Sequence, residues 1–390
     1  MDPSQTIRPI ASSPNPAQEV KSVKDRFSES AADKPEVRRY SKTRRARLGF
    51  IGAGWWSTTY YMPLLRKRSD VDLVVVCGLD QAVLQRCQGD FGFTHATRDY
   101  RELLRHGLDG VIVGSPHALH GEHALAALNA GCHVMVEKPL TTSSKAARQL
   151  VALAKRKRLH VVVPCGWQYR PIGIQARKLM KKGVTGDIEF VACHMASGLK
   201  NLLSGKLFEF EFAYVPANLS TWADPRFSVG GYGYGQLPHG IGLMLWVTGL
   251  HPKSVFARMT KPGSKVDMYD AMSLSYEGGA IGTISGAATL PLGTPGLFQL
   301  DIRVFGKRGM LHLDIAREHL SWHGHNGCHE NIPLGPRGGA YLCDGPPHQF
   351  VDLILGLTKE NNSPGEVAMH AVEILDAAYR SYRSGRNENI

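Results

Sequence analysis

The sequence predicts an α/β protein: an N-terminal doubly wound parallel sheet followed by an α+β domain with a mostly antiparallel, open-faced sheet. Short apolar runs alternate with amphipathic helical patterns as far as about Cys165, as in a parallel sheet. A glycine-rich loop follows the first apolar run. Beyond about residue 182 the pattern changes to strands separated by tight turns. We therefore expect a basic, disordered extension over 1–45, a first domain over 46–165 and a second domain over 166–390.

Composition and charge narrow the class of protein. A chain of 390 residues is long enough for two domains, and 43% apolar with 21% charged residues is ordinary for a globular protein. No apolar run approaches the roughly 20 residues that cross a bilayer, so no membrane partner is expected. The 7 cysteines are never spaced CxxC, which favours reduced thiols and a cytoplasmic location. The net charge of +12 comes without a nucleic-acid motif. It favours a basic surface or an anionic small substrate over a nucleic-acid partner.

Five buried-strand runs define the first domain. They are RLGFIG, DLVVVCG, DGVIVGSP, HVMVEKP and HVVVPCG. Helical segments such as Ser143–Arg158 separate them, which predicts a parallel sheet. In the second domain we expect strands at 188–196, 255–259, 272–276, 281–289, 298–305 and 310–315. The last long helix opens at SPGE, where Ser363 is the expected cap and Glu366 completes a capping box.

The segment GFIGAGWWS follows the first strand and opens a helix. Gly52 permits the tight turn, and Gly54 lets the backbone approach a pyrophosphate at the helix N-terminus. Ser57 is small enough to take the place of the third glycine of the pattern. The strand–turn–helix context makes this loop, with Trp55 and Trp56, a dinucleotide site of the Rossmann type.

NAD is the expected cofactor, with NADP as the alternative. A carboxylate at the end of the second strand hydrogen-bonds the ribose of NAD and repels the extra phosphate of NADP. Here the strand ends at Gly78, and the acidic residue Asp80 comes two positions later. Asp80 is the candidate for the ribose, and discrimination between the two cofactors is expected to be loose.

The region VIVGSPHALHGEHALAALNAGCHVMVEKPL (111–140) resembles the signature region of the Gfo/Idh/MocA family, the relatives of glucose–fructose oxidoreductase and inositol dehydrogenase. The resemblance extends over about residues 46–385 and implies an NAD(P)-dependent protein that presents its substrate on the second domain's sheet. The cofactor contacts that it implies are Ser115, Pro116, His117, His120, Glu137, Trp167 and Gln168. Arg170, in the segment GWQYRP, is a candidate for the substrate.

Two residues are candidates for proton transfer, which hydride transfer from a secondary alcohol requires. Lys138 lies where the parallel strands end, the edge at which open α/β sheets bind ligands, and it can also stabilise a developing oxyanion. By the resemblance, His239, seven residues before Trp246, takes the place of a catalytic histidine. Relatives usually carry Asp four residues before that histidine, and often another three after it. Here those places are Gly235 and Gly242.

His239 therefore lacks an acidic partner on its own helix. Gln236, one turn away, and the nearby Tyr232 and Tyr234 are the candidates to orient its ring. These three side chains and His239 itself are also candidates for contact with the substrate. Further substrate candidates are aromatic, cationic or polar side chains: Lys200, Asn201, Lys206, Tyr214, Trp222, Arg226, Tyr341 and Asp344. The segment HGHNGCHE (323–330) contains metal-ligand residue types. Because it lies apart from the other motifs, we expect a solvent-exposed loop and no metal site.

Three functions remain open at this stage. The first is an NAD(P)-dependent oxidoreductase that acts on a secondary hydroxyl of a sugar or polyol. The second is an NAD-dependent glycosidase that oxidises a ring hydroxyl, eliminates the glycosidic group, adds water and reduces back; its substrate would suit the basic charge if anionic. The third is a non-catalytic NAD-binding regulator. An open sheet face that exposes Leu300, Ile302 and Val304 would need a cover, so a homodimer or homotetramer is expected.

Overall fold

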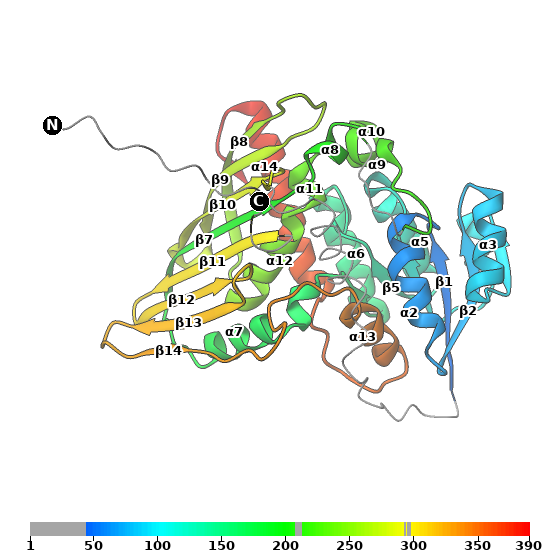
Figure 1. The fold of residues 1–390 in the computed structure, drawn as a ribbon, viewed down its shortest axis with the longest axis horizontal. Helices are drawn as coiled ribbons and strands as arrows, with labels where there is room; N and C mark the ends of the chain where they lie inside the picture. The colour runs from blue at the N-terminus through cyan, green and yellow to red at the C-terminus, as the bar shows by residue number, and fades with distance from the viewer. Residues whose placement is uncertain (1–43, 207–212, 292–293, 295–297) are drawn as a thin grey trace, which may run out of the picture. The chain divides into compact units, whose positions relative to one another are not determined.

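Two β-sheets with helices between them make up the described part of the chain (Figure 1). The computed structural model describes residues 44–206, 213–291, 294 and 298–390. Both sheets belong to one compact unit, Ser41–Ile390. The extension expected over 1–45 falls almost wholly outside the described residues.

The first sheet is the predicted doubly wound parallel sheet. Its order is β3-β2-β1-β4-β5-β6, and every pairing is parallel. The strands are β1 (Ala46–Ile51), β2 (Val71–Cys77), β3 (His95–Thr97), β4 (Gly110–Val113), β5 (His133–Val136) and β6 (Val161–Val162). The short β3 was not predicted. Strand order reverses between β1 and β4, and ligands bind at such a switch point, outside the carboxyl ends of the strands.

Helices cover this sheet. They are η2 (Ser57–Tyr61), α2 (Met62–Arg66), α3 (Gln81–Phe91), α4 (Tyr100–Leu103), η3 (His117–Leu119), α5 (His120–Asn129) and α6 (Ser144–Lys157). The strands between them are almost entirely apolar and buried, as expected for a parallel sheet with both faces covered.

The second sheet has the order β14-β13-β12-β11-β7-β10-β9-β8-β15. Only β7 and β10 pair in parallel, so the predicted mostly antiparallel sheet is confirmed. Its strands are β7 (Ile188–Ser197), β8 (Pro252–Thr260), β9 (Tyr269–Tyr276), β10 (Ile281–Ala287), β11 (Phe298–Gly306), β12 (Gly309–Asp314), β13 (His319–Gly324), β14 (His329–Asn331) and β15 (Glu388–Asn389). The segment 323–330 forms the β13–β14 turn, where His323 pairs with His329.

The prediction that Leu300, Ile302 and Val304 lie on the open face of the second sheet is wrong. All three side chains are buried, and Leu300 lies against Gly240 of α12 (Leu237–Thr248). The open face instead carries Phe305 and Ile281, which is 56% exposed. Alternation along a strand fixes which residues share a face, but not which of the two faces is covered.

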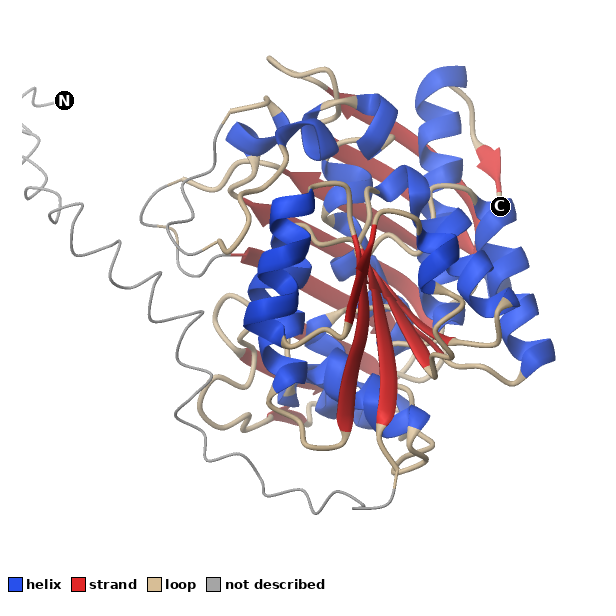
Figure 2. Cartoon of the chain, turned by 90° about the vertical axis from the view of Figure 1, so that its right-hand side faces the viewer, coloured by secondary structure: helices blue, strands red, loops and turns tan. Residues whose placement is uncertain are grey.

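The helices of the second half lie largely between the two sheets (Figures 1 and 2). They are η4 (Gly166–Tyr169), α7 (Pro171–Lys181), α8 (Lys200–Leu203), α9 (Leu219–Ala223), α10 (Pro225–Ser228), α11 (Tyr232–Gly235), α12, η5 (Glu277–Gly279), α13 (Gly345–Ile354) and α14 (Gly365–Ser384). Helix α14 contacts α6, α12 and β8 and so connects the two halves. The expected capping box is wrong, because the N-cap is Pro364 and the Ser363 hydroxyl instead contacts that of Tyr169 at 2.7 Å.

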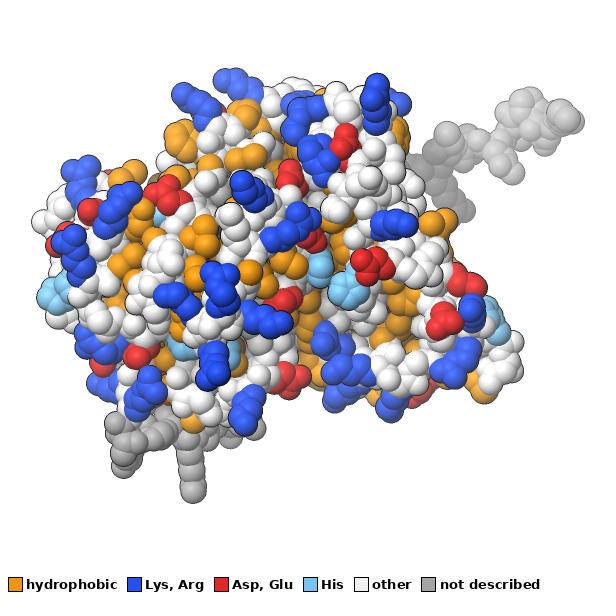
Figure 3. Space-filling view, turned by 180° about the vertical axis from the view of Figure 1, so that it is seen from behind, with side chains coloured by type: hydrophobic (Ala, Val, Ile, Leu, Met, Phe, Trp, Pro, Cys, Tyr) orange, Lys and Arg blue, Asp and Glu red, His pale blue; other side chains and the backbone are white. Residues whose placement is uncertain are grey.

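Basic side chains are numerous on the face of the molecule opposite to that of Figure 1. Figure 3 shows Lys and Arg side chains spread over the back of the molecule, with acidic and apolar side chains among them. A search of the described helices finds none long and apolar enough to cross a membrane.

Candidate active site

The glycine loop after β1 has the geometry that a dinucleotide requires. Gly52 has φ +114°, and a Cβ there would lie 2.5 Å from the carbonyl carbon of Gly114, so only glycine fits. A Cβ at Gly54 would meet nothing within 4 Å, which leaves room for a pyrophosphate against the backbone. Ser57 packs directly against Gly114, as predicted for the third position. The site residues therefore fit NAD.

The helix after this loop begins with a π-helical turn, η2, that supports Glu137. Trp56 Nε1 donates a hydrogen bond to the Tyr61 hydroxyl at 3.1 Å, and that hydroxyl donates to Glu137 Oε1. The second carboxyl oxygen, Oε2, accepts the Lys138 backbone N–H at 3.1 Å. Trp55 meets the Trp56 ring edge-on, with 5.4 Å between ring centroids. Burial raises the pKa of Glu137, while Lys138 and the Tyr61 hydroxyl oppose that shift.

Asp80 has a structural role at the end of β2. Its Oδ1 accepts the backbone N–H groups of Ala82 at 2.8 Å and Val83 at 3.1 Å, and so caps α3. A Cβ at Gly78 would lie 3.2 Å from Ala53 in the glycine loop. The end of this strand is therefore packed against the loop and carries no carboxylate. The structure leaves only Asp80 Oδ2 outside the cap.

Four residues predicted to contact the cofactor follow β4: Ser115, Pro116, His117 and His120. Of these, His120 has a structural role instead. It is fully buried, with Nδ1 2.6 Å from the Pro139 carbonyl oxygen and Nε2 2.7 Å from that of Ser115. The ring thus spans the segments after β4 and β5; burial lowers the pKa of His120 to about 4, while the two carbonyl contacts oppose that shift. Pro116 precedes η3. His117 packs edge-on against Trp222, with 5.8 Å between ring centroids.

Lys138 links the first sheet to the helices of the second half. Its Nζ donates a hydrogen bond to the Gly235 carbonyl oxygen at 2.7 Å and lies 5.4 Å from the centroid of the Trp222 ring. Burial lowers the pKa of Lys138, and the neighbouring Glu137 opposes this shift. The lysine thus reaches across from the end of β5 to α9 and α11.

His239 lies on α12 and faces the same region. It is 6% exposed, and its ring meets those of Tyr341 and Trp167 edge-on at centroid distances of 5.2 and 6.0 Å. Burial, and then the charge of Lys138, lower the pKa of His239 well below its usual range. The imidazole is therefore neutral at pH 7, and the same two effects make it a weaker base than an exposed histidine.

The predicted orienting partners of His239 are not found in the described structure. Its Nδ1 is buried and has no hydrogen-bond partner among the described residues, and the same holds for Gln236 Oε1. Gln236 bonds His239 through its backbone alone: its carbonyl oxygen accepts the His239 backbone N–H at 3.0 Å. Tyr232 and Tyr234 do not reach the ring. The Tyr232 hydroxyl meets that of Ser197 at 3.2 Å, and Tyr234 stacks on Tyr379.

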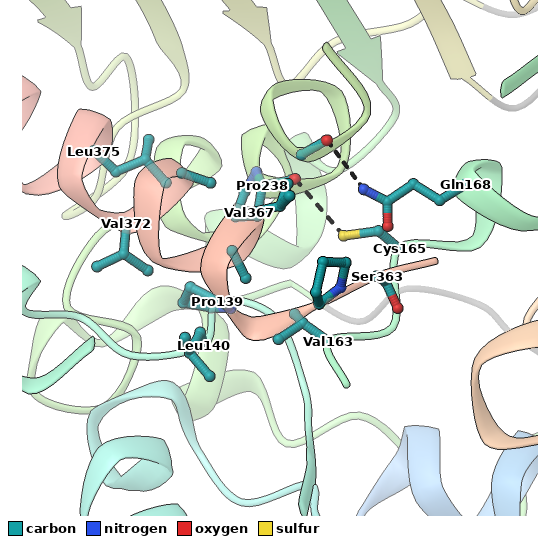
Figure 4. A pocket seen from close by; sticks show the side chains of 14 residues that line it. Pro139, Leu140, Val163, Cys165, Gln168, Pro238, Ser363, Val367, Val372 and Leu375 are labelled. Carbon is teal, nitrogen blue, oxygen red and sulfur yellow. Dashed lines mark hydrogen bonds between the residues drawn. The ribbon is translucent and has the colours of Figure 1, made fainter. Parts of the chain in front are cut away.

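Trp167 and Gln168 form a wall behind His239 rather than an exposed cofactor surface. Both are buried; Trp167 Nε1 donates to the Gly339 carbonyl oxygen and Gln168 Nε2 to that of Gly242, each at 3.0 Å. Figure 4 shows Gln168 and Cys165 beside a small cavity under α12. Its volume of about 10 Å³ is near the minimum for one water molecule. Cys165 Sγ would lie 3.3 Å from a Cβ at Gly242.

Of the predicted substrate residues, Trp222 has its ring centroid 5.4 Å from Lys138 Nζ, and Tyr341 has its ring centroid 5.2 Å from that of His239. The others lie in different surroundings. Arg170 donates to the Arg337 carbonyl oxygen at 2.6 Å, Tyr214 to Asp90 at 2.6 Å and Arg226 to Asp224, while Asp344 caps α13 and Lys200, Asn201 and Lys206 are exposed. Sequence reasoning missed Tyr61, which lies only four residues after Ser57, and Cys343, whose pKa is raised by burial and by Glu137.

The fold and the glycine loop define a Rossmann-type dinucleotide-binding protein with a second, sheet-based domain. Comparisons with known families agree. Residues 46–164 match the NAD-binding Rossmann-fold model of an oxidoreductase family, and residues 174–312 match the GFO/IDH/MocA C-terminal domain. The chain belongs to the Gfo/Idh/MocA family, and its first domain binds NAD.

Individual relatives are distant. The chain is 32% identical over 143 residues to D-glucoside 3-dehydrogenase of Escherichia coli, covering 36% of this chain and 41% of that protein. It is 32% identical over 134 residues to D-xylose 1-dehydrogenase (NADP(+)) of Hypocrea jecorina, covering 32% of this chain and 34% of that protein. In both, the matched stretch spans less than half of the relative.

Solved structures share the fold over most of the chain. An oxidoreductase domain protein from Kribbella flavida superposes with a TM-score of 0.74 at 21% identity, covering 89% of this chain and 99% of that one. Levoglucosan dehydrogenase in complex with NADH and levoglucosan superposes with a TM-score of 0.70 at 17% identity, covering 89% and 100%.

Proposed function

We propose that the chain is an oxidoreductase that transfers a hydride between a secondary hydroxyl of a sugar or polyol and a nicotinamide cofactor. The observation that carries this proposal is the approach of Lys138, from the carboxyl edge of the parallel sheet, to the helix pair that bears His239. Bound NAD supplies the carbon centre that accepts or donates the hydride. The sugar dehydrogenases among the relatives support the substrate class.

The residues present divide the remaining work. Neutral His239 accepts the hydroxyl proton, and the Lys138 ammonium stabilises negative charge that develops on the substrate oxygen. Trp222 and Tyr341, both half-buried, screen this region from water and offer apolar surface to a sugar ring. We assign the nicotinamide ribose to Glu137, whose carboxylate accepts the Tyr61 hydroxyl.

The cofactor proposal is NAD with weak discrimination against NADP. Support comes from the end of β2, where Gly78 supplies no carboxylate and one oxygen of Asp80 caps α3. A 2′-phosphate therefore meets less negative charge than it would beside a strand-end carboxylate.

We infer a homodimer or homotetramer assembled through the open face of the second sheet. Ile281 and Phe305 are exposed there, and Phe190 packs beside Phe305 with 5.9 Å between ring centroids. Glutamate at both position 281 and position 305 should produce monomers in sedimentation. A wild-type monomer at micromolar concentration would contradict the inference.

The unpaired state of all seven cysteines supports a cytoplasmic location.

A redox-assisted glycosidase is the second candidate. The space beside Gly235 is filled by Trp222, and the space beside Gly242 by Cys165, so neither place next to His239 admits a carboxylate without rearrangement. An acid–base site remodelled in this way favours a reaction other than plain polyol oxidation. A basic surface suits an anionic glycoside.

One experiment separates these functions. Aryl glycosides, sugars and polyols are screened with NAD while the absorbance of reduced nicotinamide and the release of the aryl group are followed together. The oxidoreductase predicts net formation of reduced cofactor. Release of the aryl group without net reduced cofactor would identify the glycosidase. NAD binding without either signal would leave a regulator.

A further inference from the structure

The ammonium of Lys138 has no carboxylate partner within ion-pair distance among the described residues. Its ammonium donates to the carbonyl oxygen of Gly235 and lies over the ring of Trp222. Within the described residues, no Asp or Glu oxygen is within 4.0 Å of Lys138 Nζ, the limit for an ion pair. The direct contacts of this half-buried ammonium are therefore one backbone carbonyl and one aromatic face.

The Gly235 carbonyl is free to accept this bond because the helix breaks after it. In a continuous helix the carbonyl would accept the N–H of His239, four residues later. Here Gln236 has φ −132° and ψ −41°, and the His239 N–H turns to the Gln236 carbonyl at 3.0 Å. Pro238, which immediately precedes His239, has no backbone N–H to donate. Local sequence thus directs the carbonyl toward the lysine.

Trp222 fills the space in which a side chain at position 235 would lie. A Cβ on Gly235 would be 3.4 Å from the nearest carbon of the indole ring, so the indole would be the nearest neighbour of any side chain placed there. His117 packs against the edge of the same indole at 5.8 Å between ring centroids, with its Nδ1 3.3 Å from the Ser228 carbonyl oxygen. The indole is thus fixed between α11 and the loop after β4.

We propose that Trp222 is a positioning residue for Lys138, and that its ring and the Gly235 carbonyl together hold the ammonium in place of a carboxylate. The inference rests on the proposed function, in which Lys138 touches the reacting oxygen. A carbonyl and an aromatic face stabilise an ammonium less than a carboxylate does, so the lysine gives up its proton more readily.

Other titratable groups also face Lys138 and bear on its titration. They are Glu137, Cys165, Cys343, His117, His120 and His239. Burial lowers the pKa of each of these histidines and raises that of each of these cysteines. Glu137, followed by Cys165 and Cys343, opposes the effect of burial on the pKa of Lys138, and all three are unchanged in the variants below.

The test compares Trp222→Phe with Trp222→Met, which differ in the aromatic face but little in size. The titration of Lys138 is read from the pH dependence of its acetylation, by mass spectrometry of the full chain without substrate. The methionine variant should release the lysine proton about 2- to 30-fold more readily than the phenylalanine variant. Its pH profile of kcat/KM should move by the same factor. Equal titration of Lys138 in the two variants would overturn the proposal.

A second pair covers the case in which Trp222→Met does not fold. Both Gly235→Asp and Gly235→Asn displace the indole, but only the aspartate adds charge. Lys138 should hold its proton at least tenfold more tightly in the aspartate variant, and equal titration would again overturn the proposal. These measurements need no turnover. If Lys138 titrates as predicted but the chain acts on no sugar, the proposed function is rejected and the positioning role of Trp222 stands.

Discussion

Replacing His239 by leucine should remove activity at little cost in stability. The imidazole Nδ1 is buried with no partner among the described residues, and such a group costs about 1–3 kcal/mol. The leucine removes that cost. It also removes edge-on ring contacts with Trp167 and Tyr341, each worth about 0.5–1.5 kcal/mol. The two effects nearly cancel, so the free energy of unfolding should change by less than about 1.5 kcal/mol.

Turnover should behave differently. Loss of a positioned general base lowers kcat by about 10²–10⁴-fold, whereas NAD affinity should hardly change because the glycine loop belongs to the other sheet. The assays are urea unfolding followed by tryptophan fluorescence, NAD titration, and turnover on a substrate found in the screen. A leucine variant that keeps full turnover and loses more than about 3 kcal/mol of stability would show that His239 is structural.

Three further predictions follow from the geometry. Burial, and then the Asp267 carboxylate, raise the pKa of Asp270 well above its usual range. The contribution of Asp270 to the free energy of unfolding is therefore complete below the ordinary pKa of an aspartate and is lost as the pH rises toward the raised value. Asp270→Asn should become more stable relative to the wild type as the pH rises from 5 to 8. A difference in stability that stays constant over this range would contradict the prediction. Tyr61→Phe removes a hydrogen bond to Glu137 and should lower the free energy of unfolding by about 1–3 kcal/mol in urea titrations; unchanged stability would count against that contact. Dissociation constants for NAD and NADP should differ by less than about a thousandfold, roughly 4 kcal/mol, and calorimetry that finds a larger ratio would restore a discriminating role to Asp80.

Local patterns predicted most of the fold. The apolar runs and the glycine loop carry their signal within a few residues, so both sheets and the dinucleotide site could be predicted. Strand β3 is only three residues long and too short for a periodic signal. The open face of the second sheet was misassigned because alternation places Leu300 and Ile302 on one face but does not reveal that α12 covers it.

The candidate site was predictable as a pair of residues but not as a geometry. Lys138 and His239 came from a motif and a resemblance. The contact of Lys138 with Gly235 joins residues 97 positions apart, and no local pattern predicts which side chain fills the space above a glycine. Trp222 therefore appeared as a sugar-stacking candidate, although the ammonium of Lys138 lies over its ring. The sequence shows Gly235 and Gly242 in place of the expected acids. Only the structure shows that Trp222 and Cys165 pack against these two glycines.

Transfer of deuterium tests the central claim, hydride transfer between a sugar carbon and the cofactor, most directly. Sugars deuterated at each secondary carbon in turn are mixed with the enzyme and NAD in a single turnover, and the cofactor is analysed by mass spectrometry. We predict that one position labels the nicotinamide, and that His239→Leu and Lys138→Ala each slow the labelling at least about a hundredfold. A cofactor that stays unlabelled with every sugar turned over would contradict the account.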